Sequence, residues 1–141
     1  METMAAIIAL VFILLGALHL YWVIGGTVGL NKVIPVLEGK SAIEPGKAVT
    51  LLVAFGLIAI AGISFSLGYV NLESYSYSNY LIYAGWFLTV VFLARAVGDF
   101  KLVGFFKKIK GSEFATYDTK YYSPFCLLVS MAFAVLSSSH T

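Results

Sequence analysis

Charged residues are scarce in this sequence, and cysteine is almost missing. Only 11% of the 141 residues are Asp, Glu, Lys or Arg, whereas 60% are hydrophobic, which lies outside the range of ordinary soluble domains. The single cysteine, Cys126, excludes an internal disulfide and a thiolate metal cluster within one chain. The lysines flank apolar runs instead of forming a basic stripe on a solvated face. We therefore expect no nucleic-acid partner and no metal site.

Recognisable catalytic motifs are also missing. The sequence contains no Walker motif, nucleophile elbow, HExxH motif or Gly-rich nucleotide loop. It therefore names no cofactor and leaves open whether the protein is an enzyme.

Long apolar runs occupy most of the chain. About 20 apolar residues are needed to cross a bilayer as a helix. The runs predict membrane spans over about residues 4–24, 48–70, 80–98 and 122–139. Because these spans and their loops use nearly the whole chain, residues 1–141 are predicted to form one all-α membrane domain, a four-helix bundle. Met1, Glu2 and Thr3 lack the positive charge that begins a signal peptide, so we expect the first span to be retained.

The positive charges predict the orientation of this bundle. All nine Lys and Arg residues lie in the loops 31–47 and 99–120 or at Arg95. By the positive-inside rule these loops are cytoplasmic, and both termini face outward together with a tyrosine-rich turn at 71–79. We expect a multi-pass protein of the bacterial inner membrane. The second loop mixes Phe with Lys107, Lys108 and Lys110, which predicts an interfacial amphipathic segment that contacts anionic lipids.

Small residues suggest where helices approach each other closely. Gly56, Gly62 and Ser66 in the second span predict a closely packed neighbouring helix. Gly25 and Gly29 form one GxxxG motif, which does not by itself establish a dimer, so a homodimer stays open.

His19 and Arg95 are the two ionisable residues predicted to lie inside spans, where such groups are costly and often functional. The topology places both near the cytoplasmic end. Helical spacing puts Trp22 and Gly26 on the same face as His19. His19 could relay a proton, ligate a metal or haem, or bond a ligand; the alternative is a structural hydrogen bond to a neighbouring helix.

Three carboxylate and phenol groups accompany these residues. Asp99 is four residues after Arg95, which predicts an ion pair on one helix face; Arg95 could instead bind a phosphate or carboxylate. Asp118 either orders its loop or joins His19 as an acid/base pair. Tyr122 precedes Ser123 and Pro124, which are typical of an N-cap and a first-turn proline.

The chain resembles the DUF3995 family of small four-helix bacterial membrane proteins. Four blocks along nearly its whole length carry the resemblance, namely His19–Trp22 with Gly25 and Gly26, Arg95–Phe100, Phe114–Asp118 and Tyr122–Cys126. The resemblance implies the fold and a shared site, but no activity, because the family's function is unassigned.

These observations predict a polar pocket, open to the cytoplasm, between the first, third and fourth spans. Its expected ligand-binding residues are His19, Tyr21, Trp22, Arg95, Asp99, Asp118 and Tyr122. We expect contacts with membrane lipids and the binding or transport of a small molecule or lipid headgroup. An intramembrane enzyme acting on a lipid or isoprenoid, and an accessory subunit of a membrane complex, are the alternatives.

Overall fold

Four long apolar segments form helices, because a chain in hydrocarbon must satisfy its own backbone hydrogen bonds. In the computed structural model these segments are α1 (Glu2–Val23), α3 (Lys47–Tyr69), α4 (Ser78–Val97) and a continuous helical run over Glu113–Ser138. Each is long and apolar enough to cross a membrane. The predicted all-α fold with four spans is therefore confirmed.

The structure describes residues 1–37, 40–41, 45–70 and 76–140. Glu38, Gly39 and Glu44 of the predicted loop 31–47 lie outside these residues, and so does most of the predicted tyrosine-rich turn at 71–79.

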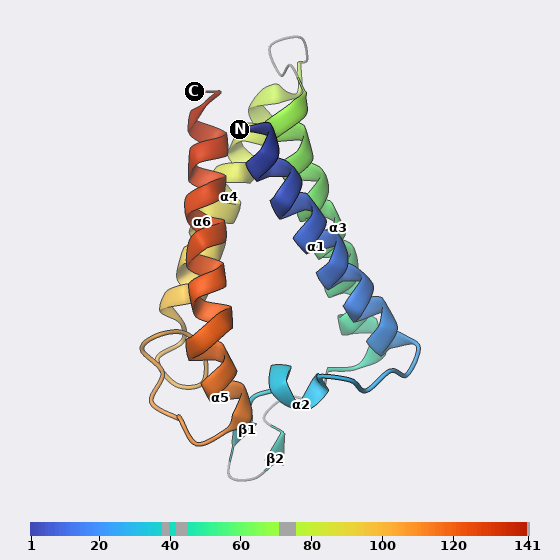
Figure 1. Cartoon of the computed structure of the whole chain (residues 1–141), viewed down its shortest axis with the longest axis vertical. Helices are drawn as coiled ribbons and strands as arrows, with labels where there is room; N and C mark the ends of the chain where they lie inside the picture. Colours follow the sequence, from blue (N-terminus) through green and yellow to red (C-terminus); the bar gives the residue numbers. More distant parts are fainter. Residues whose placement is uncertain (38–39, 42–44, 71–75, 141) are drawn as a thin grey trace.

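The helices pair as two hairpins in sequence order. We call α1 with α3 hairpin one, and α4 with α6 (Ser123–Ser138) hairpin two. Figure 1 shows that the hairpins meet at the end that carries both chain termini and diverge toward the opposite end. We call that opposite end, where α1 leads to α3 and α4 leads to α6, the loop end. The termini share one end, as an even number of spans requires; the side of the membrane that they face stays a prediction.

Hairpin one is held by close contact between small residues. A Cβ atom on Gly68 would overlap the Ala5 side chain, and the Ser64 hydroxyl donates to the Ala5 carbonyl oxygen at 3.0 Å. The predicted packing role of Gly56 and Gly62 is wrong, because both are exposed and a Cβ atom on either would have no neighbour within 4 Å. Gly25 and Gly29 lie after α1 ends, so they are not part of a helix-packing motif.

Aromatic residues join the two hairpins where they meet. The Phe12 ring of α1 lies 5.5 Å from that of Phe92 and 6.1 Å from that of Phe125. Nearer the termini, His140 Nε2 lies 2.8 Å from the Leu67 carbonyl oxygen, so the ring donates this hydrogen bond. The shared core is therefore confined to the converging half of the molecule.

The fourth helical run begins well before the apolar stretch that revealed it. The Ser112 hydroxyl accepts from the Ala115 amide at 3.1 Å and caps α5 (Glu113–Tyr117), which continues through a π-helical turn, η2 (Asp118–Tyr122), into α6. The predicted N-cap at Ser123 is therefore wrong. Proline lacks an amide hydrogen, and the change from π to α geometry just before Pro124 lets it sit inside a continuous helix.

The chain between the long helices forms compact, mostly irregular structure at the loop end. After α1, a short helix α2 (Leu30–Val33) precedes a two-residue antiparallel pair, β1 (Val36–Leu37) and β2 (Lys40–Ser41). Figure 1 shows α2 in the space between the diverging hairpins. Residues 99–112 form no helix, so the amphipathic segment predicted there is not helical.

Candidate functional site

Asp118 is the centre of a buried ionic cluster in hairpin two. Its Oδ1 accepts from Arg95 Nη2 at 2.7 Å, and its Oδ2 accepts from Lys107 Nζ at 2.9 Å and from the Gly104 amide at 2.8 Å. Asp118 and Lys107 are almost completely buried. Because both carboxylate oxygens are occupied and no solvent reaches them, this aspartate cannot serve as the acid/base partner of His19.

Lys107 is held by more than its ion pair. Its ammonium also donates to the Gly104 carbonyl oxygen at 3.0 Å and to the Thr119 hydroxyl at 2.6 Å. The prediction that Lys107 contacts lipid headgroups is therefore wrong, although Lys108 and Lys110 beside it are exposed. The cluster fastens the loop 99–112 to α4 and η2.

Asp99 orders the start of that same loop. One of its carboxylate oxygens accepts from the amides of Lys101, Leu102 and Val103 at 2.7 to 3.0 Å. These backbone donors, with Val103 the strongest, hold the pKa of the Asp99 carboxyl below its ordinary value. The predicted Arg95–Asp99 pair is wrong because α4 ends at Val97 and the following glycine turns the chain away.

Two glycines let this loop fold back onto the end of α4. Gly98 and Gly104 have φ angles of +92° and +88°. A Cβ on Gly98 would overlap the Val103 carbonyl oxygen, and a Cβ on Gly104 would overlap the Cα of Gly98. The crossing lets the Phe105 amide donate to the Ala96 carbonyl at 2.9 Å, so a carbonyl at the helix end is satisfied.

Tyr122 lies outside the ionic cluster, at the contact between α2 and hairpin two. Its hydroxyl donates to the Lys32 carbonyl oxygen at 3.2 Å, and Asn31 Nδ2 donates to Glu113 Oε2 at 2.6 Å. The Lys32 ammonium lies 5.1 Å from the centre of the Tyr117 ring, and its interaction with that side chain raises the pKa of Lys32. We call α2 with these contacts the strap, because it links hairpin one to hairpin two across the loop end.

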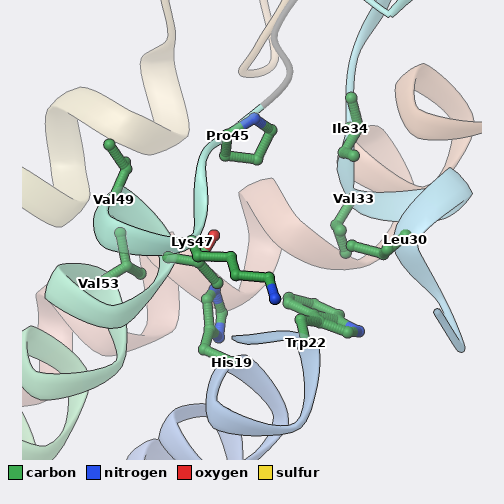
Figure 2. Close-up of a pocket in the computed structure, with 10 residues that line it drawn as sticks. His19, Trp22, Leu30, Val33, Ile34, Pro45, Lys47, Val49 and Val53 are labelled. Carbon is green, nitrogen blue, oxygen red and sulfur yellow. The ribbon is translucent and has the colours of Figure 1, made fainter. Parts of the chain in front are cut away.

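A cavity of about 530 Å³ lies between the strap and hairpin one. Figure 2 shows the side chains around it. They come from α1, α2, the start of α3 and the chain that adjoins α2 and α3, and they are His19, Trp22, Leu30, Val33, Ile34, Pro45, Lys47, Val49, Thr50 and Val53. The third and fourth spans, which were predicted to line the polar pocket with the first, do not line this cavity, because α1 pairs with α3 while α4 pairs with α6.

His19 presents one free nitrogen to this cavity. Its Nδ1 lies 2.8 Å from the Leu15 carbonyl oxygen, and since a carbonyl only accepts, Nδ1 carries the hydrogen. With the hydrogen of the tautomer on Nδ1, Nε2 is the acceptor of the ring, and the described residues provide no donor for it. Trp22 fixes the ring, with the two ring centres 4.7 Å apart, and its own Nε1 donates to the Val28 carbonyl at 2.9 Å.

Lys47 brings a positive charge to the same cavity. Figure 2 shows its side chain extending from the start of α3 toward Trp22. It forms no ion pair with any described residue. The first turn of α3 has no acidic residue and no side-chain cap, and a cation at a helix N-terminus is unfavourable. Within the described part of the chain, no carboxylate offsets this charge on the cavity wall, and an anion would neutralise it.

The structure thus brings together only part of the predicted site. His19 and Trp22 share the cavity, whereas Arg95 and Asp118 form the ionic cluster and Tyr122 belongs to the strap. Tyr21 is partly exposed and packs over the Gly26 backbone, away from the cavity lining. Sequence reasoning missed Lys47, for which the available signal was its place at the start of the second span, at the same end of the bundle as His19 near the end of the first span.

No three His, Cys, Asp or Glu side chains among the described residues are grouped so that they could hold a metal ion. The helices and the cavity define a small four-span membrane protein with a cationic, mostly apolar pocket at one end. The chain belongs to the family described as "Protein of unknown function (DUF3995)", whose sequence profile matches residues 12–133. No curated protein and no solved structure matches the chain.

Proposed function

We propose that this protein binds an anionic group, a phosphate or carboxylate of headgroup size, in the cavity beside His19 and Lys47. The observation that carries the proposal is the placement of both side chains on the wall of one cavity of about 530 Å³. Ligand cavities usually combine an apolar lining with a few polar groups that fix orientation, and this cavity has that composition.

Each polar group has a distinct role in the proposed complex. Lys47 supplies the charge that attracts the anion. His19, whose Nδ1 already donates to the Leu15 carbonyl oxygen, accepts a hydrogen bond from a ligand hydroxyl at Nε2. Thr50 also lines the cavity, and its hydroxyl, which donates to the Gly46 carbonyl at 3.2 Å, keeps an oxygen available as an acceptor.

Of the two functions expected from the sequence, binding and transport, the cavity supports binding. Arg95, which the sequence suggested as the anion-binding residue, is engaged with Asp118, and the proposal transfers that role to Lys47. Transport, and catalysis by an acid/base pair of His19 and Asp118, have no support of this kind.

Binding is tested by titrating the purified protein in detergent with dihexanoyl phosphatidate, a short-chain lipid with a phosphate monoester, and counting bound molecules by native mass spectrometry. Lys47→Ala should weaken binding about tenfold, because a hydrogen bond to a charged group contributes about 1.5 kcal/mol or more. His19→Ala should weaken it by a smaller factor.

Lys101→Ala is the matched control, since it removes the same charge from an exposed lysine that does not line the cavity. Its affinity should equal that of the unmodified protein. Equal affinity in the Lys47→Ala and Lys101→Ala variants would show that the cavity is not the binding site and would overturn the proposal.

A further inference from the structure

An apolar groove of about 490 Å³ lies between the two hairpins, nearer the chain termini than the cationic cavity. Its walls come from α1, including Ile8 and Val11, and from α6, including Phe125 and Leu128. Leu128 is 65% exposed, so the groove is open to its surroundings at a depth where those surroundings are hydrocarbon.

The groove and the cavity lie along one face of α1. Residues three and four apart on a helix share a face. Met4, Ile8 and Val11 line the groove, His19 and Trp22 line the cavity, and Leu15 continues the same spacing between them. At 1.5 Å per residue, the path from His19 to Val11 is about 12 Å long.

This arrangement matches the form of a membrane lipid, with a charged end and an apolar chain. One leaflet of the hydrocarbon core is about 15 Å thick, half of the usual 30 Å. An acyl chain attached to an anionic headgroup beside His19 would therefore reach Val11 and Ile8 along the face of α1. A small water-soluble anion would use the cavity but leave the groove without a role.

We infer that the ligand is an anionic membrane lipid, with its headgroup in the cavity beside His19 and Lys47 and one acyl chain in the groove between α1 and α6. This inference rests on the proposed function, because it takes the headgroup site from it. It adds the class of the ligand and the segment that recognises its chain.

The test compares two phosphatidates that share a headgroup and differ in chain length, dihexanoyl and dioleoyl, with competition against dioleoyl phosphatidylcholine. The variant Leu128→Trp fills the groove with a larger side chain at an exposed position. Leu52→Trp is the matched control, because Leu52 is 72% exposed and lines neither the groove nor the cavity.

Leu128→Trp should weaken the binding of dioleoyl phosphatidate about threefold or more, because dispersion contacts with its long acyl chain are lost. The binding of dihexanoyl phosphatidate should be unchanged. Leu52→Trp should change neither. If Leu128→Trp and Leu52→Trp bind the long-chain lipid equally while Lys47→Ala still weakens both lipids, the chain site is wrong and the headgroup site stands. If Lys47→Ala weakens the binding of neither phosphatidate, or if dioleoyl phosphatidylcholine displaces dioleoyl phosphatidate as well as phosphatidate itself does, only bulk lipid is bound and both proposals are overturned.

Discussion

At the scale of single residues, Lys107 and Lys108 differ sharply although they are neighbours in the chain. Lys107 is 2% exposed and bonds to Asp118, whereas Lys108 is exposed. Lys107→Ala should lower the free energy of unfolding by about 3 kcal/mol, because it removes one partner of a buried ion pair. Lys108→Ala should leave stability unchanged.

The buried thiol of Cys126 offers a direct measurement of this difference. A thiol-reactive dye labels it as the protein unfolds on heating, so the labelling temperature reports stability. Labelling of the two lysine variants at the same temperature would contradict the structural role of Lys107.

Asp99 should make the stability of its loop depend on pH. Its pKa is lowered in the folded protein, so its contribution is present above the unfolded value of about 3.8 and is lost as the pH falls through the folded value. The carboxylate is solvent-exposed and screened, so we expect Asp99→Asn to lower the free energy of unfolding by less than about 1 kcal/mol at pH 7. Melting curves of the two proteins should converge below pH 3.8, and a constant difference at all pH values would argue against this role.

The sequence singled out His19, Arg95 and Asp118, but it missed Lys47 and did not show which residues pair with one another. Arg95 and Asp99 are close in sequence, so helical spacing paired them; the real partner, Asp118, is 23 positions away. That pairing depends on the path of the loop 99–112, which two glycines with positive φ determine. Nothing in the run of lysines distinguishes the buried one from its exposed neighbours.

At the scale of elements, α3 shows why small residues alone do not predict a helix interface. A helix in a membrane is apolar on every side, so its composition does not separate the packed face from the lipid face. The long apolar runs predicted the four spans, because length and hydropathy are enough to identify a membrane-spanning helix. The face of α3 that packs is the one that meets α1, where Ala54 lies beside Gly16, and Ser64 and Gly68 lie beside Ala5.

Two glycines of α3 give a matched pair of variants. Gly68→Leu should destabilise the protein by about 1 to 3 kcal/mol, because its side chain would overlap Ala5 and separate α1 from α3. Gly62→Leu should have little effect, because no atom lies within 4 Å of the new Cβ. The midpoint of unfolding in a denaturing detergent measures both, and a loss of stability in Gly62→Leu of equal size would contradict this interface.

At the scale of the whole molecule, the strap connects the diverging ends of the hairpins. Tyr122→Phe removes the hydroxyl that donates to the Lys32 carbonyl, a bond with a net contribution of about 1 kcal/mol. Amide hydrogen exchange at Lys32 and Ile34 should then become about fivefold faster. Tyr121→Phe makes the same change at the neighbouring exposed tyrosine and should leave that exchange rate unaltered. Equal exchange in both variants would show that the strap does not depend on Tyr122.

The divergence of the hairpins is also the feature that the sequence could not predict. Hydropathy gives the number and order of the spans, but not the angle between pairs of them. That angle depends on where large and small side chains meet, such as the aromatic contacts of Phe12 in the converging half. His19 lines the cavity beside hairpin one, whereas Arg95 pairs with Asp118 in the ionic cluster, so two residues predicted to share one pocket belong to different parts of the molecule.

A membrane protein that is wider at one end occupies more area in one leaflet than in the other. Here the hairpins diverge at the loop end, and the strap lies in the space between them (Figure 1). The leaflet at the loop end must therefore expand relative to its opposite leaflet, which favours a bilayer that is convex on that side. Reconstituted with the loops outward, the protein should concentrate in small vesicles over large ones of the same lipid, and an equal surface density in both would show that the wedge shape has no influence on curvature.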